Sequence, residues 1–149
     1  MKATDFSLIG DDDKRHELAD NHGKWTVIYF YPADDTPGCT VEACSIRDEY
    51  ENLANLDVRV YGISMNTPAE HKRFRAKYNL PFTLLSDPTG ETIRAYGAWG
   101  KGMFGREGIK RQTFIIGPDG DIKKVYKNVT PLGHGAQISR YIKTLQSAG

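Results

Sequence analysis

The chain contains two cysteines, Cys39 and Cys44, and the residues before Cys39 are typical of a helix start. Thr36 is a favourable N-cap, Pro37 suits the first helical position, and Gly38 lets the backbone approach a ligand closely. Cys39 would then lie in the first helical turn, where unpaired N–H groups and the positive end of the helix dipole favour an anion. A thiol in that place ionises more readily than a free one, and the thiolate is the nucleophilic form. The sequence therefore predicts a nucleophilic sulfur at Cys39.

A second segment of the chain begins in the same way. Thr67-Pro68-Ala69-Glu70 repeats the Thr-Pro start, and its glutamate stands where it completes a capping box. In Thr36-Pro37-Gly38-Cys39 the cysteine takes the position of that glutamate. We therefore expect a thiolate at a position where a helix start normally holds a carboxylate.

The spacing of Cys39 and Cys44 has a mechanical consequence. On an ideal helix, Cα atoms five positions apart stand roughly 8–9 Å from each other and about 140° around the axis. A disulfide needs the two Cα atoms within about 7 Å. If these two cysteines form a disulfide, the helix that carries them must first unwind.

The composition is that of an ordinary globular protein, with 39% hydrophobic and 26% charged residues. Twenty basic and nineteen acidic residues leave a net charge of +1, so a surface for nucleic acid or an anionic membrane is not expected. No apolar run approaches the ~20 residues of a membrane span, and the first residues carry no secretory signal. Two cysteines are too few for a disulfide-stapled secreted scaffold. We expect a soluble, cytoplasmic protein.

The elements that position Cys39 follow from the hydrophobic periodicity. An apolar run predicts a buried strand over 26–31, followed by a helix that runs to about Leu56. The core-facing side of that helix is expected to hold Cys39, Ala43, Ile46, Tyr50 and Leu53. Further strands are expected at 5–8, 58–64, 82–85, 111–116 and 121–127, and further helices at 68–78, 91–96 and around 138–145.

The resulting order, β-α-β-α-β-β-α with the cysteine helix after the first core strand, is the thioredoxin-like arrangement. We expect an α/β fold with a central mixed β-sheet flanked by helices, as a single domain over residues 1–149. Its strand–helix–strand unit implies parallel strands with a right-handed crossover. The reactive sulfur would lie beyond the carboxyl end of a strand, where open α/β sheets usually bind ligands.

Four smaller expectations concern polar and glycine-rich segments. The run Asp11–Asp13 is expected to be a solvated turn, and His16 and His22 to be surface residues. His71 is expected to be a half-buried structural histidine. The segment 97–108, with five glycines, is expected to be a mobile flap or hairpin that exposes Trp99, Met103 and Phe104.

With these residues in view, the chain resembles the peroxiredoxins, and among them the Q-type or bacterioferritin-comigratory branch. The motif that carries the resemblance is Pro32-x-x-x-Thr36-x-x-Cys39, followed by Cys44 in the same helix. Segments similar to that family's occur in order along nearly the whole chain: Asp5–Leu8, Tyr61–Ser64, Leu80–Phe82, Leu84–Asp87 and Arg111–Ile116. The departures are Thr4, where many relatives have proline, and Asn66, where aspartate is common.

The resemblance implies a role for each matched residue. Cys39 corresponds to the peroxidatic cysteine, and Thr36 to the hydroxyl that positions peroxide and thiolate. Pro32 would shield the pocket, and Arg111 would stabilise the thiolate and the departing oxygen. By a weaker correspondence with the family, Glu42 would hold Arg111 in place.

The implied activity is reduction of hydrogen peroxide and organic hydroperoxides by a thiol. Cys39 would become a sulfenic acid, and Cys44 would condense with it to an intramolecular disulfide. A dithiol protein such as thioredoxin, or a glutaredoxin-type reductant, would restore both thiols. The implied enzyme needs no metal, haem or flavin, and an intrahelical resolving cysteine favours a monomer.

Three alternatives remain from the residues alone. A general thiol–disulfide oxidoreductase on the same fold would normally use Cys-x-x-Cys, whose sulfurs can bond without unwinding the helix. A metal-binding module that used Cys39 and Cys44 would need further ligands at tight spacing, and the nearest histidines are far away in sequence. The third alternative is a domain without enzymatic activity that buries two inert cysteines.

Overall fold

The computed structural model describes residues 2–101 and 107–148 of the chain. The first half contains β1 (Ser7–Gly10), β2 (Arg15–Glu17), the short 3₁₀ helix η1 (Leu18–Asn21), β3 (Trp25–Phe30), α1 (Pro37–Asn55), β4 (Val58–Ser64) and α2 (Pro68–Tyr78). The second half contains β5 (Thr83–Ser86), α3 (Glu91–Ala95), β6 (Trp99–Lys101), β7 (Glu107–Ile109), β8 (Gln112–Ile116), β9 (Ile122–Tyr126) and α4 (His134–Ala148).

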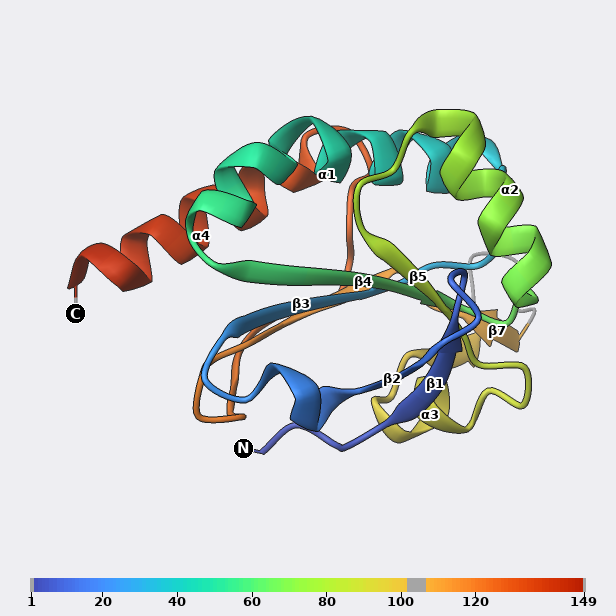
Figure 1. Ribbon diagram of the computed structural model, residues 1–149, viewed down its shortest axis with the longest axis horizontal. Coiled ribbons are helices and arrows are strands. Elements are labelled where there is room, and N and C mark those ends of the chain that lie inside the picture. The colour runs from blue at the N-terminus through green and yellow to red at the C-terminus, as the bar shows by residue number, and fades with distance from the viewer. Residues whose placement is uncertain (1, 102–106, 149) are drawn as a thin grey trace.

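Seven of these strands form one mixed sheet in the order β2-β1-β5-β4-β3-β8-β9. The central strands β3, β4 and β5 are parallel, while β1, β8 and β9 run antiparallel to their neighbours. Helices α1, α2 and α4 lie on one side of the sheet, and α3 lies on the other side (Figure 1). The predicted thioredoxin-like fold with a mixed sheet flanked by helices is confirmed.

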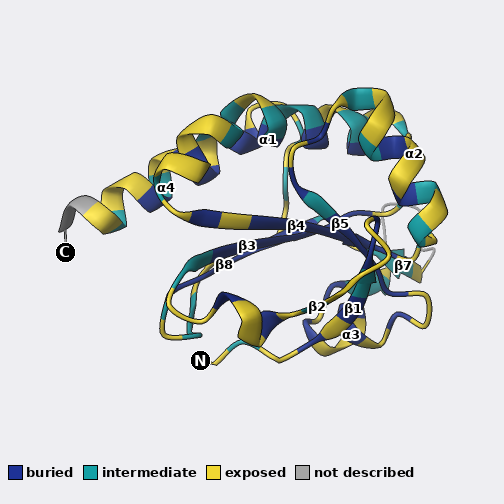
Figure 2. Cartoon of the chain, in the orientation of Figure 1, coloured by how far each residue is buried: buried dark blue, intermediate teal, exposed yellow. Residues whose placement is uncertain are grey.

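Strand β3 is the centre of the core because both of its faces are covered. Val27 and Tyr29 pack toward α1 and α4, together with Ile46, Leu53 and Ile142. The alternate residues Ile28 and Phe30 pack into a second cluster on the opposite side, together with Phe6, Ile93 and Phe114. Buried residues, dark blue in Figure 2, therefore fill the middle strands, and exposed residues lie on the outer surfaces of the helices. A strand covered on both faces reads as a continuous apolar run, which is why the sequence predicted it.

The predicted elements are present with small shifts of their ends, and two short elements were missed. The three-residue strand β2 and the 3₁₀ helix η1, which follow the first turn, were not predicted. The first strand begins at Ser7 rather than at Asp5. Within the glycine-rich segment, β6 and β7 form an antiparallel pair, and Met103 and Phe104 lie outside the described residues. Trp99 is partly buried, with the Arg94 guanidinium 4.4 Å from the centre of its ring.

Two expectations about polar residues were wrong. Asp11 is buried rather than solvated, because its carboxylate accepts hydrogen bonds from the Leu84 amide and from the Arg75 guanidinium. His71 is completely buried rather than half-buried. Isolated buried charges are costly unless they are paired, and both residues lie in polar networks that local sequence patterns do not reveal.

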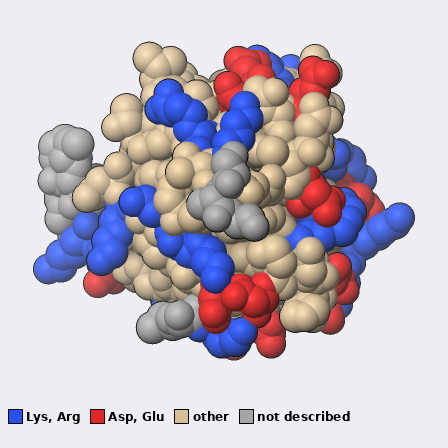
Figure 3. Space-filling view, turned by 90° about the vertical axis from the view of Figure 1, so that its left-hand side faces the viewer, with Lys and Arg blue, Asp and Glu red and all other residues tan. Residues whose placement is uncertain are grey.

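No helix in the described ranges is long and apolar enough to cross a membrane. Figure 3 shows the end of the molecule opposite α2 and β7, where Lys and Arg side chains are interrupted by uncharged residues and border acidic groups. This face therefore does not carry the uniform positive surface on which nucleic-acid binding depends.

Candidate active site

Helix α1 begins at Pro37, directly after the loop that leaves the carboxyl end of β3. Thr36 occupies the N-cap position with extended backbone angles, but its hydroxyl donates to the Ala33 carbonyl at 3.0 Å instead of capping the helix. Cys39 is the third helical residue and is 1% exposed. Its sulfur thus lies in the first turn, where the helix supplies unpaired N–H groups and a positive partial charge.

Arg111 is the cation nearest to this sulfur among the contacts of the described chain. Its Nη1 atom lies 3.4 Å from Cys39 Sγ and 2.7 Å from Glu42 Oε1. The sheet brings it there: Arg111 immediately precedes β8, and the antiparallel pairing of β8 with β3 sets Gln112 opposite Phe30. The start of β8 and the end of β3 therefore meet at the same edge of the sheet, beside the start of α1.

Glu42 lies one helical turn after Cys39 and is fully buried. Burial raises the pKa of its carboxyl to about 7, although the hydrogen bond and the charge of Arg111 act in the opposite direction. Burial also works against the charge of Arg111, but the hydrogen bond to Glu42 and the nearby charges raise its pKa above the ordinary value. Arg111 therefore remains a cation, while Glu42 gains a proton near neutral pH.

Gly38 has a steric role next to Arg111. A Cβ atom at this position would lie 3.0 Å from Arg111 Nη2, closer than side chains normally approach. Absence of a side chain therefore leaves room for the guanidinium to reach Cys39. The sequence had suggested close approach of a ligand here, and the structure places a side chain of the protein itself against this glycine.

A cavity of about 960 Å³ opens beside Arg111. Pro32 lies on its wall together with Arg111, Ile109 and Val129, and three lysines, Lys101, Lys110 and Lys127, surround it. Pro32 and Arg111 thus lie on the same opening, where a small molecule can approach the guanidinium that contacts Cys39.

Cys44 lies elsewhere on the surface of α1. It is partly exposed and lines a separate groove of about 400 Å³ between α1 and the start of α4, with Val41 and Leu132 on its rim. Both cysteines are free thiols. The structure thus brings Cys39, Glu42 and Arg111 together, with Thr36 and Pro32 nearby, and leaves Cys44 on another side of an intact helix.

The sequence reading missed a polar cluster that holds the loop before α1. Asp34 Oδ2 lies 2.7 Å from His71 Nδ1, and Asp34 Oδ1 accepts a hydrogen bond of 2.5 Å from the Tyr31 hydroxyl. Asn66 Oδ1 accepts a hydrogen bond from the Asp34 amide. Two of these partners, His71 and Asn66, lie more than 30 residues from Asp34 in the chain, so no local pattern could have revealed them. Only the polar residues of the loop itself, Asp34 and Asp35, gave a signal.

Among the described residues, no group of three or more His, Cys, Asp or Glu side chains is arranged to hold a metal ion. The arrangement at Cys39 is suited to a different chemistry. A sulfur nucleophile that attacks an electrophilic oxygen needs a fixed position and a cation close to the charge that develops on the departing oxygen. The first turn of α1 fixes the sulfur, and Arg111 supplies the cation. With a thioredoxin-like sheet, this arrangement defines the class of thiol-dependent peroxidases.

Comparison with known proteins agrees with that class. Residues 1–125 match the model of the AhpC/TSA family. Peroxiredoxin Bcp of Bacillus subtilis is 41% identical over 148 residues, which cover 97% of this chain and 94% of that protein. The crystal structure of a cysteine-to-serine variant of PrxQ from Xylella fastidiosa superposes with a TM-score of 0.90 at 29% identity, covering 95% of this chain and 89% of that one.

A second solved structure, the bacterioferritin comigratory protein of Xanthomonas campestris, superposes with a TM-score of 0.88 at 29% identity, covering 93% of this chain and 90% of that one. That structure is described in connection with the alkyl peroxide reduction activity of that protein. The chain belongs to the AhpC/TSA family, in its Bcp and Q branch of peroxiredoxins. It is a thiol-dependent peroxidase.

Proposed function

We propose that Cys39 is the peroxidatic residue of this enzyme and that Cys44 is its resolving residue. The observation that carries the proposal is the position of Arg111 Nη1, which lies between Cys39 Sγ at 3.4 Å and Glu42 Oε1 at 2.7 Å. A guanidinium in this place stabilises a thiolate and meets the negative charge of a departing oxygen. Glu42 braces the guanidinium, and the hydroxyl of Thr36 positions the peroxide.

The reaction begins with attack of the Cys39 thiolate on one peroxide oxygen. The S–O bond forms as the O–O bond breaks, and the leaving alkoxide or hydroxide takes a proton to become an alcohol or water. Cys39 is left as a sulfenic acid. The cavity beside Pro32 and Arg111 supports entry of the peroxide at this point, and its size supports organic hydroperoxides as substrates together with hydrogen peroxide.

The second step joins the two cysteines. The Cys44 thiol attacks the sulfenic acid of Cys39, a disulfide forms, and water leaves. Because Cys39 is buried and Cys44 lies on another side of α1, the first turns of the helix must unwind before the sulfurs meet. A thioredoxin or a glutaredoxin-type dithiol then supplies two electrons and two protons, which regenerates both thiols. The reaction uses no metal or organic cofactor.

The same features support the rest of the proposal. An intramolecular disulfide requires no second subunit, so we propose a monomer. Two free thiols, one of them partly exposed, fit a reducing compartment such as the cytoplasm.

The proposal is tested by peroxide consumption in the presence of thioredoxin, thioredoxin reductase and NADPH. Cys39→Ser is expected to abolish peroxide reduction. Cys44→Ser is expected to consume one equivalent of peroxide and then to stop as a sulfenic acid that a dimedone adduct reveals by mass. If wild type consumed peroxide without dependence on Cys39, the assignment of Cys39 would be lost. Sustained turnover of Cys44→Ser would show that a different thiol resolves the sulfenic acid.

A further inference from the structure

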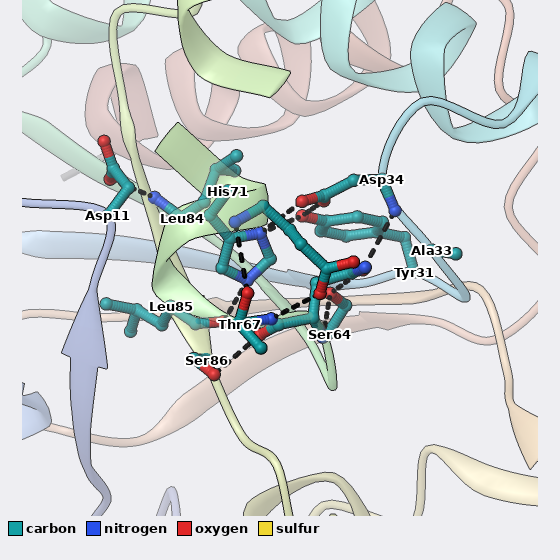
Figure 4. Close-up of polar contacts among 12 residues, drawn as sticks. Asp11, Tyr31, Ala33, Asp34, Ser64, Thr67, His71, Leu84, Leu85 and Ser86 are labelled. Atoms are coloured by element: carbon teal, nitrogen blue, oxygen red, sulfur yellow. Dashed lines mark hydrogen bonds and ion pairs between the residues drawn. The ribbon is translucent and has the colours of Figure 1, made fainter. Parts of the chain in front are cut away.

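The buried pair of Asp34 and His71 joins α2 to the loop that precedes the Cys39 helix. The His71 side chain is 0% exposed and the Asp34 side chain 6% exposed. In Figure 4 the two side chains point toward one another, and Tyr31 lies beside them. The reaction described above uses none of these groups, although burying polar groups is costly unless they are hydrogen-bonded.

His71 uses both of its ring nitrogens to connect separate parts of the fold. Nε2 lies 3.0 Å from the Leu85 carbonyl oxygen of β5, and Nδ1 lies 2.7 Å from Asp34 Oδ2 in the loop before α1. The Tyr31 hydroxyl also donates to Asp34 Oδ1. The Asp34 carboxyl is therefore held at both of its oxygens, by His71 of α2 and by Tyr31 directly after β3.

The loop that this pair holds is conformationally strained. Asp35 has a φ angle of 59°, a left-handed conformation that costs a residue other than glycine free energy. Asp34 also donates its amide to Asn66 Oδ1 at 2.9 Å. The Asp34 contacts are partly buried, whereas the contacts of Asp35 with Lys77 and Tyr78 are exposed and therefore weaker. The conformation of the loop thus depends on the Asp34 contacts more than on its own backbone preference.

The segment between this loop and Ser45 contains both cysteines. At its far end, the Ser45 hydroxyl accepts a hydrogen bond from the Gly135 amide of α4, and Arg47 donates to the Tyr78 carbonyl at the end of α2. At its near end, Thr36 does not cap α1. The part of α1 that must unwind therefore lies between two attachments to the rest of the fold.

We infer that Asp34 and His71 are positioning residues that fix the near end of this segment. They hold the first turn of α1 against Arg111 in the reduced enzyme, and they set the point at which unwinding stops after oxidation. The inference rests on the proposed roles of Cys39 and Cys44. Loss of the pair should therefore change the two chemical steps in opposite directions. The attack on peroxide becomes slower because Cys39 is less well placed, and disulfide formation becomes faster because unwinding costs less.

The test compares Asp34→Asn with Asp11→Asn. Asp11 is also a buried carboxylate bound to α2, through Arg75, but it is joined to β5 and not to the loop before Cys39. Both variants lose one charge from a buried ion pair, so both should unfold at lower denaturant concentration. If Asp34→Asn does not fold, His71→Gln replaces it, since a glutamine amide carries its donors on one nitrogen, whereas the imidazole contacts its two partners through two nitrogens.

Two rates are measured by rapid quench and mass analysis. Formation of the sulfenic acid is followed in the Cys44→Ser background, and its decay to the disulfide is followed with both cysteines present. For Asp34→Asn we expect the first rate to fall and the second to rise, each by about threefold to tenfold, the range of one ordinary hydrogen bond. For Asp11→Asn we expect both rates to stay within about twofold. Rates in Asp34→Asn that are unchanged, or that move in the same direction as each other, would overturn the inference.

Hydrogen exchange of the reduced protein tests the positioning role without any peroxide. Amides in the first two turns of α1 should exchange about tenfold faster in Asp34→Asn than in wild type or Asp11→Asn. If wild type shows no Cys39-dependent turnover, the proposed function fails, and the exchange result alone decides whether the pair orders this helix start. Equal protection of these amides in all three proteins would contradict the role.

Discussion

The chain begins two helices with Thr-Pro, and the two starts are satisfied by different means. At the start of α2, the Thr67 hydroxyl accepts from the Glu70 amide at 3.1 Å, and Glu70 Oε1 accepts from the Thr67 amide at 2.9 Å. At the start of α1, the Thr36 hydroxyl bonds backward to the Ala33 carbonyl, and Cys39 stands at the position of Glu70. The start of α2 is capped by side chains of its own first four residues, and the start of α1 is not.

The carboxylates near the two helix starts also differ, in their burial and in the direction of their pKa shifts. Glu70 is partly exposed, and its hydrogen bond to the Thr67 amide lowers its pKa. Glu42 is buried, which raises its pKa to about 7. The start of α2 therefore has a cap that its own four residues supply. The start of α1 leaves its positive end to the Cys39 sulfur, which contacts Arg111 from far along the chain.

The largest expected effect comes from removal of Arg111. In Arg111→Ala the sulfur of Cys39 loses its cation, and we expect the peroxide step to slow by about 10²–10³-fold, as when one preorganised donor is removed from an active site. Arg47→Ala is the matched control, because Arg47 lies on the same helix but donates to the Tyr78 carbonyl. Single-turnover formation of the sulfenic acid measures the step. An unchanged rate in Arg111→Ala would remove this residue from the site.

The second prediction concerns the pH dependence of stability at Glu42. Because its pKa in the folded protein lies above the ordinary value of 4.5, the stabilisation of its protonated form is fully present below pH 4.5 and is lost as the pH rises through about 7. Glu42→Gln keeps a neutral side chain at all pH values. Relative to wild type, its free energy of unfolding should therefore increase by up to roughly 3 kcal/mol between pH 4.5 and pH 8.

Denaturant unfolding of the reduced proteins at pH 5 and pH 8 measures this difference. Glu70→Gln is the control with the opposite sign. The lowered pKa of Glu70 gives stability that is present above its ordinary pKa of 4.5 and lost as the pH falls below it. Relative to wild type, this variant should therefore lose stability as the pH rises from about 3 to 5, and it should show almost no change between pH 5 and pH 8. If both variants moved in the same direction, the difference between the two helix starts would not be electrostatic.

A pair of threonine variants tests the caps directly. Thr67→Val removes a hydroxyl that accepts from the Glu70 amide, and it should cost about 1 kcal/mol of stability with turnover unchanged. Thr36→Val removes no cap from α1, so we expect a smaller loss of stability but a peroxide step about tenfold slower, the effect of one hydrogen bond worth about 1.4 kcal/mol. Thermal unfolding and single-turnover rates separate the two. Equal effects on both measurements would mean that the two starts are equivalent.

The two helix starts also differ in how far the sequence alone predicts them. The capping box of α2 and the core-facing stripe of α1 are local patterns, and both were predicted correctly. The strands that flank Cys39 were predicted because an apolar run indicates burial.

Arg111 could be selected only through the resemblance to peroxiredoxins, since periodicity does not distinguish one arginine from another. The contact of Asp34 with His71 joins residues 37 positions apart, and the burial of Asp11 depends on residues at least 64 positions away. Such contacts depend on the completed fold and have no local signal.

The smallest effect is expected at the second helical position, which is Gly38 in α1 and Ala69 in α2. Gly38→Ala should stabilise the helix by about 0.5–1 kcal/mol, because alanine has the higher helix propensity and Gly38 does not have a positive φ angle. The new Cβ would lie 3.0 Å from Arg111 Nη2, so the guanidinium must move by a few tenths of an ångström. Because small misplacements at a reacting centre are costly, the peroxide step should slow by about twofold to fivefold. Ala69→Gly should do the reverse for stability and leave the rate unchanged. A variant Gly38→Ala that was both more stable and fully active would show that the glycine is not needed to bring Arg111 to the sulfur, and the contrast between the two helix starts would then rest on Cys39 alone.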